Sequence, residues 1–370
     1  MNQADIKVSV VIPVYNAYDY LRPALDSVID QSLREIEIIC VDDGSSDGSA
    51  KLLREYAYID KRIRVVEHGI NAGVSTARNK GIIRASGEYI VFLDADDFYE
   101  PNLLETLYER AKADDLDIAI ASFDYYNNKR SRFLAATEEP HSSIYAGGAV
   151  VSHSEYPDYI FDSTSGYVWN KMFRTEFIKD KGLMFPAELS AFEDTCFVYC
   201  ALSLAERVGR EEQVMVHHRI YSDQSRAKLY RKAYSSIPEV YLKVKSFLTR
   251  HGMYVPLARS FINTSTRHCY RVYNLLWSDE REAFWEMLHG GMADSLGWFA
   301  QENDDFETQE LADFAANVGL YTYSQYMSRR DTGRLTDTKR WSPTRLYRRI
   351  RGAKIWERIA ARFKKSPEEK

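Results

Sequence analysis

Buried strands alternate with amphipathic helices along the first quarter of the chain, and this alternation limits the folds available to it. Four short apolar runs are typical of buried strands, at residues 8–14, 36–41, 63–67 and 89–93. Between them, apolar residues recur at helical spacing in residues 19–29, 49–58 and 75–83. Strands that alternate with helices build a parallel sheet, because each helix returns the chain to the same end of the sheet. We therefore expect an α/β fold in which helices flank a mostly parallel central sheet.

Polar side chains follow three of these strands at the point where each strand ends. Tyr15 and Asn16 follow the first strand, Asp42 and Asp43 follow the second, and residues 94–97 follow the fourth. The carboxyl ends of parallel strands meet at one edge of a sheet, and ligands of open α/β sheets bind at that edge. No glycine-rich dinucleotide fingerprint or P-loop follows the first strand, so a bound phosphate would be held by side chains and a metal.

Three carboxylates fall within four positions after the fourth strand, at Asp94, Asp96 and Asp97. Like charges so close together repel, and each loses solvation near a core. One interpretation is that these acids end the strand and cap the next helix, since Pro101 follows closely. The other is that they bind a divalent cation, which removes both costs. The convergence of three polar clusters on one edge favours the metal, with Asp97 left as the cap.

The composition is that of a soluble globular chain and carries no nucleic-acid signature. Charged residues make up 28% and hydrophobic residues 45% of the 370 residues, and the net charge is −5. The first seven residues are mostly polar and lead straight into a strand, unlike a secretory leader. No stretch of about 18 uncharged apolar residues occurs. We therefore expect a cytoplasmic protein of roughly two or three domains.

Six segments resemble motifs of the bacterial family 2 glycosyltransferases, in the order and spacing of that family. They lie at residues 8–16, 41–47, 71–79, 93–97, 169–174 and 192–194, and the resemblance covers residues 6–226. It implies a GT-A catalytic domain at residues 1–226. It also implies transfer of a sugar, with inversion, from a nucleotide-diphosphate donor, most often a UDP-sugar. The acceptor would be a hydroxyl of a glycan or a lipid-linked molecule, and the usual setting is cell-surface polysaccharide synthesis.

The resemblance also implies a metal site. Asp94, Ala95 and Asp96 match the DXD motif of the family, so Asp96 would bind Mg²⁺ or Mn²⁺ and Asp94 would face the ribose or the metal. His218 stands where some relatives place a further metal ligand, whereas many relatives carry tyrosine at or beside this position. His217 is a rival for this role, and a surface histidine that binds no metal is the alternative to both.

Other matched positions imply contacts with the donor. Pro13, Tyr15 and Asp43 match residues that line the nucleobase pocket in the family, and the Asp43 carboxylate can accept an N–H of the base. Arg78 would lie near the nucleotide. Arg219 would reach the diphosphate.

Asp194 matches the catalytic base of the family, and Glu193 would orient the acceptor or the base. The two residues open an apolar segment with helical spacing that extends to about residue 205. A base at a helix N-terminus is expected to have a lowered pKa, which keeps it ionised and able to accept a proton. The alternative is that the acidic pair only complements the helix dipole.

The C-terminal third matches no motif and divides by charge. Residues 227–328 have helical spacing, and their aromatic side chains are more typical of a helical core than of a carbohydrate platform or an oligomer contact. Residues 329–370 form a basic tail, with 14 Lys and Arg against 3 Asp and Glu between residues 329 and 365. One hypothesis is an interfacial helix on anionic lipid at the inner face of the plasma membrane, near a lipid-linked acceptor. The other is a basic segment that covers the acidic body or stays solvated.

Two other functions compete with glycosyl transfer. A nucleotidyltransferase can use a similar nucleotide-binding sheet, but it predicts a glycine- and lysine-rich loop where this chain has Tyr15, Asn16 and Ala17. A catalytically inactive carbohydrate-binding protein would have no need of both Asp96 and Asp194. The leading interpretation is an inverting, metal-dependent hexosyl- or N-acetylhexosaminyltransferase.

Overall fold

The chain is described by a computed structural model that covers residues 6–136, 139–221, 225–300 and 305–332. Contacts between residues divide it into two compact units. The first unit comprises Met1–Leu229 and Ser246–Leu257, and the second comprises Tyr230–Lys245 and Ala258–Lys370. The basic tail predicted at residues 329–370 lies almost entirely outside the described residues.

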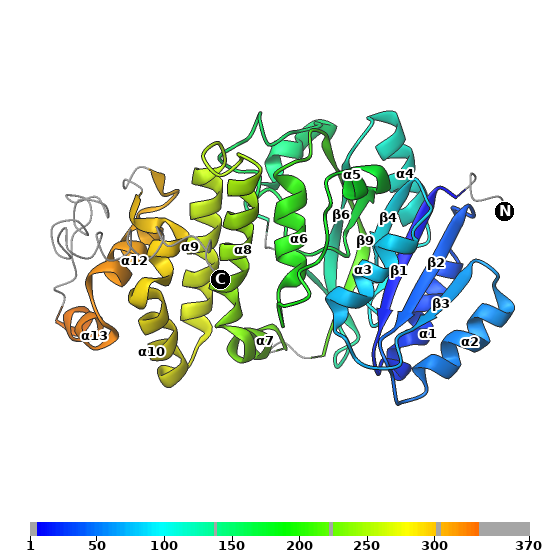
Figure 1. Ribbon diagram of the computed structural model, residues 1–370, viewed down its shortest axis with the longest axis horizontal. Helices are drawn as coiled ribbons and strands as arrows, with labels where there is room; N and C mark the ends of the chain where they lie inside the picture. Colours follow the sequence, from blue (N-terminus) through cyan, green and yellow to red (C-terminus); the bar gives the residue numbers. More distant parts are fainter. Residues whose placement is uncertain (1–5, 137–138, 222–224, 301–304, 333–370) are drawn as a thin grey trace, which may run out of the picture. The chain divides into compact units, whose positions relative to one another are not determined.

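A mixed sheet is the framework of the first unit (Figure 1). Its strand order is β3-β2-β1-β4-β8-β6-β9-β5, and β7 pairs with β6. The first four strands in this order are parallel, as predicted, and β8 is antiparallel to both of its neighbours, β4 and β6. The strands are β1 (Val8–Val14), β2 (Ile36–Asp42), β3 (Ile63–Glu67), β4 (Tyr89–Phe92), β5 (Phe98–Tyr99), β6 (Ile118–Asn127), β7 (Arg132–Ala135), β8 (Lys171–Arg174) and β9 (Val208–Ile220).

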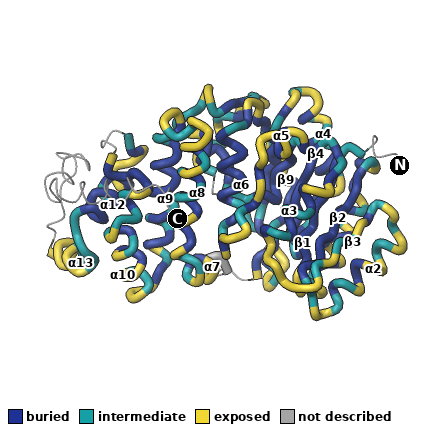
Figure 2. Tube along the Cα trace, viewed as in Figure 1, coloured by how far each residue is buried: buried dark blue, intermediate teal, exposed yellow. Residues whose placement is uncertain are grey.

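Helices cover both faces of this sheet, because side chains of β1 alternate between two cores. Val10 and Ile12 belong to the core that β1 shares with α1, α2 and α4. Val11 points the other way, toward α3, where a Cβ on Gly81 would lie 2.3 Å from its Cγ1. The buried residues run along these strands (Figure 2). The helices of this unit include α1 (Tyr18–Ile29), α2 (Ser49–Ile59), α3 (Val74–Arg84), α4 (Leu103–Ala113), α5 (Thr175–Asp180) and α6 (Glu193–Leu202).

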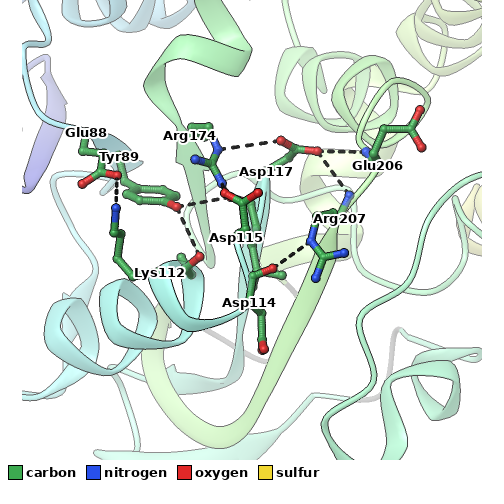
Figure 3. Close-up of polar contacts among 11 residues, drawn as sticks. Glu88, Tyr89, Lys112, Asp114, Asp115, Asp117, Arg174, Glu206 and Arg207 are labelled. Carbon is green, nitrogen blue, oxygen red and sulfur yellow. Dashed lines mark hydrogen bonds and ion pairs between the residues drawn. The ribbon is translucent and has the colours of Figure 1, made fainter.

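The amino edge of β4 carries a network of paired charges (Figure 3). Arg174 Nη2 lies 2.6 Å from Asp115 Oδ1, and Lys112 Nζ lies 2.7 Å from Glu88 Oε1. The Arg174 guanidinium also stands over the ring of Tyr89. These two ion pairs join the start of β4, the C-terminal end of α4 and β8. The polar clusters that the sequence predicts as a site lie at the other edge.

The second unit is helical and has an aromatic core. Trp285 and Trp298 are fully buried, and Trp285 stacks on Tyr326 with ring centroids 4.2 Å apart. Trp277, by contrast, is 66% exposed. No helix among the described residues is long and apolar enough to cross a bilayer. The helices after β9 are α7 (Ser225–Ala233), α8 (Ser236–Arg250), α9 (Ala258–Leu275), α10 (Ser278–Met287), α11 (Ala293–Leu296), α12 (Gln309–Leu320) and α13 (Tyr323–Asp331).

Candidate active site

A cavity of about 500 Å³ opens at the carboxyl edge of β1, β2 and β4. Its lining includes Pro13, Asp94 and Asp96, which are predicted to bind the donor or the metal and lie at the ends of two strands. Tyr15 and Asp43, both predicted for the nucleobase, line it as well. The structure thus brings five of the predicted residues to one cavity. The other predicted site residues lie on β9, α3 and α6 and do not line the cavity.

Asp43 is built into the wall of this cavity. It is 3% exposed, and its carboxylate accepts hydrogen bonds from the backbone N–H groups of Ala72, at 2.9 Å, and Gly73, at 2.7 Å. His68 Nδ1 lies 2.7 Å from the same carboxylate. These contacts fix the loop that precedes α3. A carboxylate has about four acceptor sites, so these three contacts leave capacity for an N–H of a base.

Arg78 connects the cavity to the start of α6. It is 3% exposed, its Nη2 lies 2.7 Å from Asp94 Oδ1, and its Nη1 lies 2.6 Å from Glu193 Oε1. Burial lowers the pKa of Arg78, but the neighbouring carboxylates outweigh this and raise it above its ordinary value. Arg78 is therefore a permanent cation between two predicted site residues. The guanidinium also stands over the Phe185 ring.

Asp194 lies in the first turn of α6, next to Glu193. Phe192 precedes them with φ of 59°, so the helix begins on a left-handed turn. The Thr195 backbone N–H donates to Asp194 Oδ1 at 2.8 Å. Desolvation by the surrounding protein, and then the Glu193 charge, raise the pKa of Asp194 to about 7. The expectation of a lowered pKa is therefore wrong, because burial and Glu193 outweigh Arg78 and the Thr195 backbone N–H.

The two histidines of β9 have different surroundings. His217 has a carboxylate at each ring nitrogen, with Asp124 Oδ1 2.7 Å from Nδ1 and Glu100 Oε1 2.9 Å from Nε2. His218 contacts a carboxylate through Nδ1 only, at 2.8 Å from Asp97 Oδ2. Of the two rings, His218 therefore has the better geometry for a metal ligand, since its Nε2 is not used in these contacts. Burial lowers the pKa of His218, but Asp97, Asp94 and Asp96 raise it to about 9.

Asp97 holds β9 in place. It is fully buried, contacts His218, and accepts the backbone N–H of Arg219 at 2.8 Å. Burial raises its pKa to about 6, although His218 opposes this shift. The sequence pattern predicted a helix cap here, but α4 begins at Leu103 with Asn102 as its N-cap residue. Sequence reasoning missed this role because the partner of Asp97 lies more than a hundred residues away.

Hydrogen bonds and aromatic rings fix the Arg219 side chain beside the ends of β4 and β6. Its Nε donates to the backbone oxygen of Asp96 at 2.7 Å, and its Nη1 donates to Asn128 Oδ1 at 2.7 Å. Its guanidinium lies among aromatic rings that include those of Tyr20 and Tyr126. Arg219 therefore supports the backbone of the predicted metal ligand. Its contact with a diphosphate stays a prediction.

The predicted metal ligands suit Mg²⁺ or Mn²⁺ in chemistry, because carboxylate oxygens with one imidazole are donors that these ions accept. Asp96 Oδ2 is engaged by the Tyr221 hydroxyl at 2.6 Å, and burial raises the Asp96 pKa. Within the residues that the structure describes, no three His, Cys, Asp or Glu side chains form a ready-made metal cluster. A metal at this site would therefore share the Asp96 carboxylate with the Tyr221 hydroxyl or displace that hydroxyl.

The chain is similar in sequence and in fold to known proteins. A family model described as "Glycosyl transferase family 2" matches residues 9–177. EpsH of Bacillus subtilis, described as a glycosyltransferase, is 32% identical over 248 residues, which are 66% of this chain and 70% of EpsH. The poly(ribitol-phosphate) beta-glucosyltransferase of Bacillus spizizenii is 30% identical over 210 residues, 55% of this chain and 31% of that protein. The crystal structure of S. aureus TarS 1–349 in complex with UDP-GlcNAc covers 89% of this chain and 92% of its own, with a TM-score of 0.67 at 18% identity.

Proposed function

The chain belongs to glycosyl transferase family 2 and has a GT-A fold, and on this premise we propose that it is an inverting, metal-dependent glycosyltransferase. The proposed donor is a nucleotide-diphosphate sugar, by preference a UDP-sugar. The proposed acceptor is a hydroxyl of a glycan or of a lipid-linked glycan in cell-surface polysaccharide synthesis. A relative that glucosylates poly(ribitol phosphate) and a fold neighbour crystallised with UDP-GlcNAc support these two choices.

One observation carries the proposal, and it is the bridge that Arg78 makes between the cavity and α6. A single guanidinium contacts Asp94 in the cavity wall and Glu193 beside Asp194. A residue proposed to bind the donor and a residue beside the proposed base thus contact the same side chain. The bridge supports an inverting transfer, which needs a base close to the donor, since the acceptor hydroxyl must attack from the face opposite the leaving diphosphate and lose its proton there.

The metal would be held by Asp96, with Asp94 and His218 as the further donors. When bound, a divalent cation neutralises the charge that develops on the leaving diphosphate. The residues of the chain prepare this site in two ways. Asp97 orients the His218 ring through Nδ1, and Arg219 supports the Asp96 backbone.

Asp194 would accept the proton of the acceptor hydroxyl. Its Oδ1 is engaged by the Thr195 N–H, so Oδ2 is the oxygen available for the proton. A pKa of about 7 suits this role, because the group is ionised in a large fraction of molecules and still binds a proton strongly. Asp43 and Tyr15 would hold the nucleobase, with Asp43 accepting a ring N–H.

A donor screen tests this function and separates it from the alternatives. We expect UDP-sugars to raise the melting temperature in the presence of Mn²⁺ but not of EDTA, and to release UDP slowly. A nucleotidyltransferase would instead release pyrophosphate from a nucleoside triphosphate and a sugar phosphate. An inactive carbohydrate-binding protein would be stabilised by glycans and by no nucleotide. Either of these last two results contradicts the proposal.

A further inference from the structure

A buried lysine holds the segment that lies between Thr195 and His218, and it has no role in the proposed reaction. Lys171, the first residue of β8, is 1% exposed. Its ammonium donates to the backbone oxygens of Ser165, at 2.9 Å, and Tyr167, at 2.7 Å, and to Asn170 Oδ1, at 2.8 Å. All three acceptors are neutral and belong to residues 165–170. The burial of an ammonium group among neutral oxygens is costly, and it lowers the pKa of Lys171 to about 7.

The segment that Lys171 holds reaches the first turn of α6. Gly166 lies between two of the residues that the ammonium contacts. A Cβ at this position would lie 2.7 Å from Thr195 Oγ1 and 3.0 Å from Thr195 Cγ2. Thr195 follows Asp194 directly and donates its backbone N–H to the Asp194 carboxylate. The segment is therefore packed against the residue that orients the proposed base.

The same segment also reaches the proposed metal ligand. The ring of Trp169 stacks on His218 with centroids 4.8 Å apart and an interplanar angle of 6°. The Tyr167 ring also stacks on Trp169, with centroids 4.8 Å apart and an interplanar angle of 16°, and lies 6.1 Å from the His218 ring. Asn170 anchors the segment to β6, since its side-chain amide donates to the Ala121 oxygen at 2.9 Å. Movement of residues 165–170 would thus change the position of both His218 and the start of α6.

We propose that Lys171 is a positioning residue that couples the two sides of the site by fixing residues 165–170 between Thr195 and His218. In functional terms this inference rests on the proposed roles of Asp194 and His218, whereas the structural coupling can be measured without them. In its protonated form Lys171 supplies three directed donors from one buried point, which no uncharged side chain of this length does. Methionine has a similar length and no donor, so Lys171→Met removes the bonds and leaves the volume filled.

Hydrogen–deuterium exchange tests the coupling without any assay of activity. In Lys171→Met we expect amide exchange to rise about 10- to 100-fold in residues 165–170, 193–196 and 217–219, the factor that loss of a hydrogen bond to a charged group implies. Residues 8–14 should stay protected. The control is Lys179→Met, which removes an exposed lysine that donates to the Ala85 oxygen. A rise confined to residues 165–170, or an equal rise over the whole first unit, would overturn the proposal.

A double-mutant cycle that combines Lys171→Met with Gly166→Ala tests the same coupling at the contact with Thr195. Each single variant should lower kcat about 10- to 100-fold and weaken Mn²⁺ binding. Donor affinity at saturating Mn²⁺ should stay within about 3-fold, because residues 165–170 are not among the residues that line the cavity. If both variants act through one segment, the double variant should be no slower than the slower single one by more than about 3-fold.

Full multiplication of the two losses would overturn the proposal. So would a loss of kcat that matches the unfolded fraction while Mn²⁺ affinity is unchanged, since that is the effect of lower stability alone. If Lys171→Met does not fold, Gly166→Ala and the exchange of residues 193–196 and 217–219 decide the matter. A wild-type chain that releases no UDP from any donor contradicts the proposed function, and the exchange experiment still tests the coupling.

Discussion

At the scale of single residues, the surroundings of Asp194, the proposed base, predict a pH range for activity. Burial and the Glu193 charge raise its pKa to about 7, whereas Arg78 opposes them. A base must be deprotonated to act, so the ionised fraction falls as the pH drops through this value. We expect kcat/KM for the donor to fall tenfold per pH unit below about pH 7.

Glu193→Gln is expected to move this acid limb to lower pH. The substitution removes a negative charge beside Asp194 and releases Arg78 from one of its two carboxylates. Both changes favour the ionised form of Asp194, so its pKa falls. The absolute rate should decrease, while the ratio of kcat/KM at pH 6 to that at pH 8 should increase. An unchanged or higher apparent pKa in the pH–rate profile would contradict this assignment.

Asp97→Asn is expected to weaken Mn²⁺ binding about 10- to 100-fold, because outer partners of metal-binding histidines have effects of this size. Asp97 is the contact that orients His218. Asp42→Asn is a matched control, since Asp42 is also buried at this edge of the sheet and accepts the Ser45 N–H. Titration of Mn²⁺ followed by electron paramagnetic resonance measures both variants. Equal affinities for Asp97→Asn and Asp42→Asn would exclude the proposed role.

At the scale of elements, the sequence predicts the first half of the sheet well and the second half poorly. The strand at Val8–Val14 is found as predicted, because an unbroken apolar run between turns has few other structures open to it. The resemblance marks residues 169–174 as a motif but does not predict the antiparallel strand that lies there between β4 and β6. Its four strand residues include a buried lysine, so no apolar pattern marks them. The pairing depends on contacts distant in sequence.

The same limit applies to the site. The sequence predicts that Asp43, Asp94 and Asp96 lie close together, because the topology alone places the ends of their strands at one edge of the sheet. The contact of Asp97 with His218 could not be predicted in this way, since it joins two segments that no local pattern relates. The raised pKa of Asp194 could not be predicted either, because it arises from burial that the sequence does not show.

The position of α6 depends on an aromatic cluster, and Phe197→Ala tests how much this cluster stabilises the fold. Phe197 is 1% exposed and stacks on Phe185 with centroids 4.1 Å apart, and it also contacts Phe92 and Phe173. Truncation of a buried phenylalanine lowers the free energy of unfolding by about 3–5 kcal/mol. Phe133→Ala, at an exposed side chain, should cost less than about 1 kcal/mol. Urea unfolding measures both, and equal small losses would show that the cluster does not hold α6.

At the scale of the whole molecule, charge is distributed unevenly along the chain. Residues 329–365 hold 14 Lys and Arg against 3 Asp and Glu, whereas the chain as a whole has a net charge of −5. Aromatic and aliphatic residues are interleaved with these charges, for example at Trp356 and Ile359. This composition suits peripheral contact with an anionic membrane surface, where a lipid-linked acceptor would be found.

Deletion of residues 333–370 is expected to abolish cosedimentation with vesicles of phosphatidylcholine and phosphatidylglycerol. The melting temperature and the release of UDP from the donor should not change, because the cavity and its wall lie within residues 13–221. A variant with Trp341, Trp356 and Phe363 changed to serine keeps every charge and separates electrostatic from apolar binding. Vesicle binding by the truncated chain that equals that of the full chain would contradict the membrane hypothesis.

The central claim is that Asp194 takes the proton of the acceptor while the donor is held elsewhere, and Asp194→Asn tests it most directly. Asparagine keeps the shape of the side chain and cannot act as a base. Steady-state kinetics with the UDP-sugar identified in the screen should show kcat lowered about 10²- to 10⁴-fold. The dissociation constant of that donor with Mn²⁺ should stay within about 3-fold of the original. Transfer by Asp194→Asn at the original rate would contradict the account.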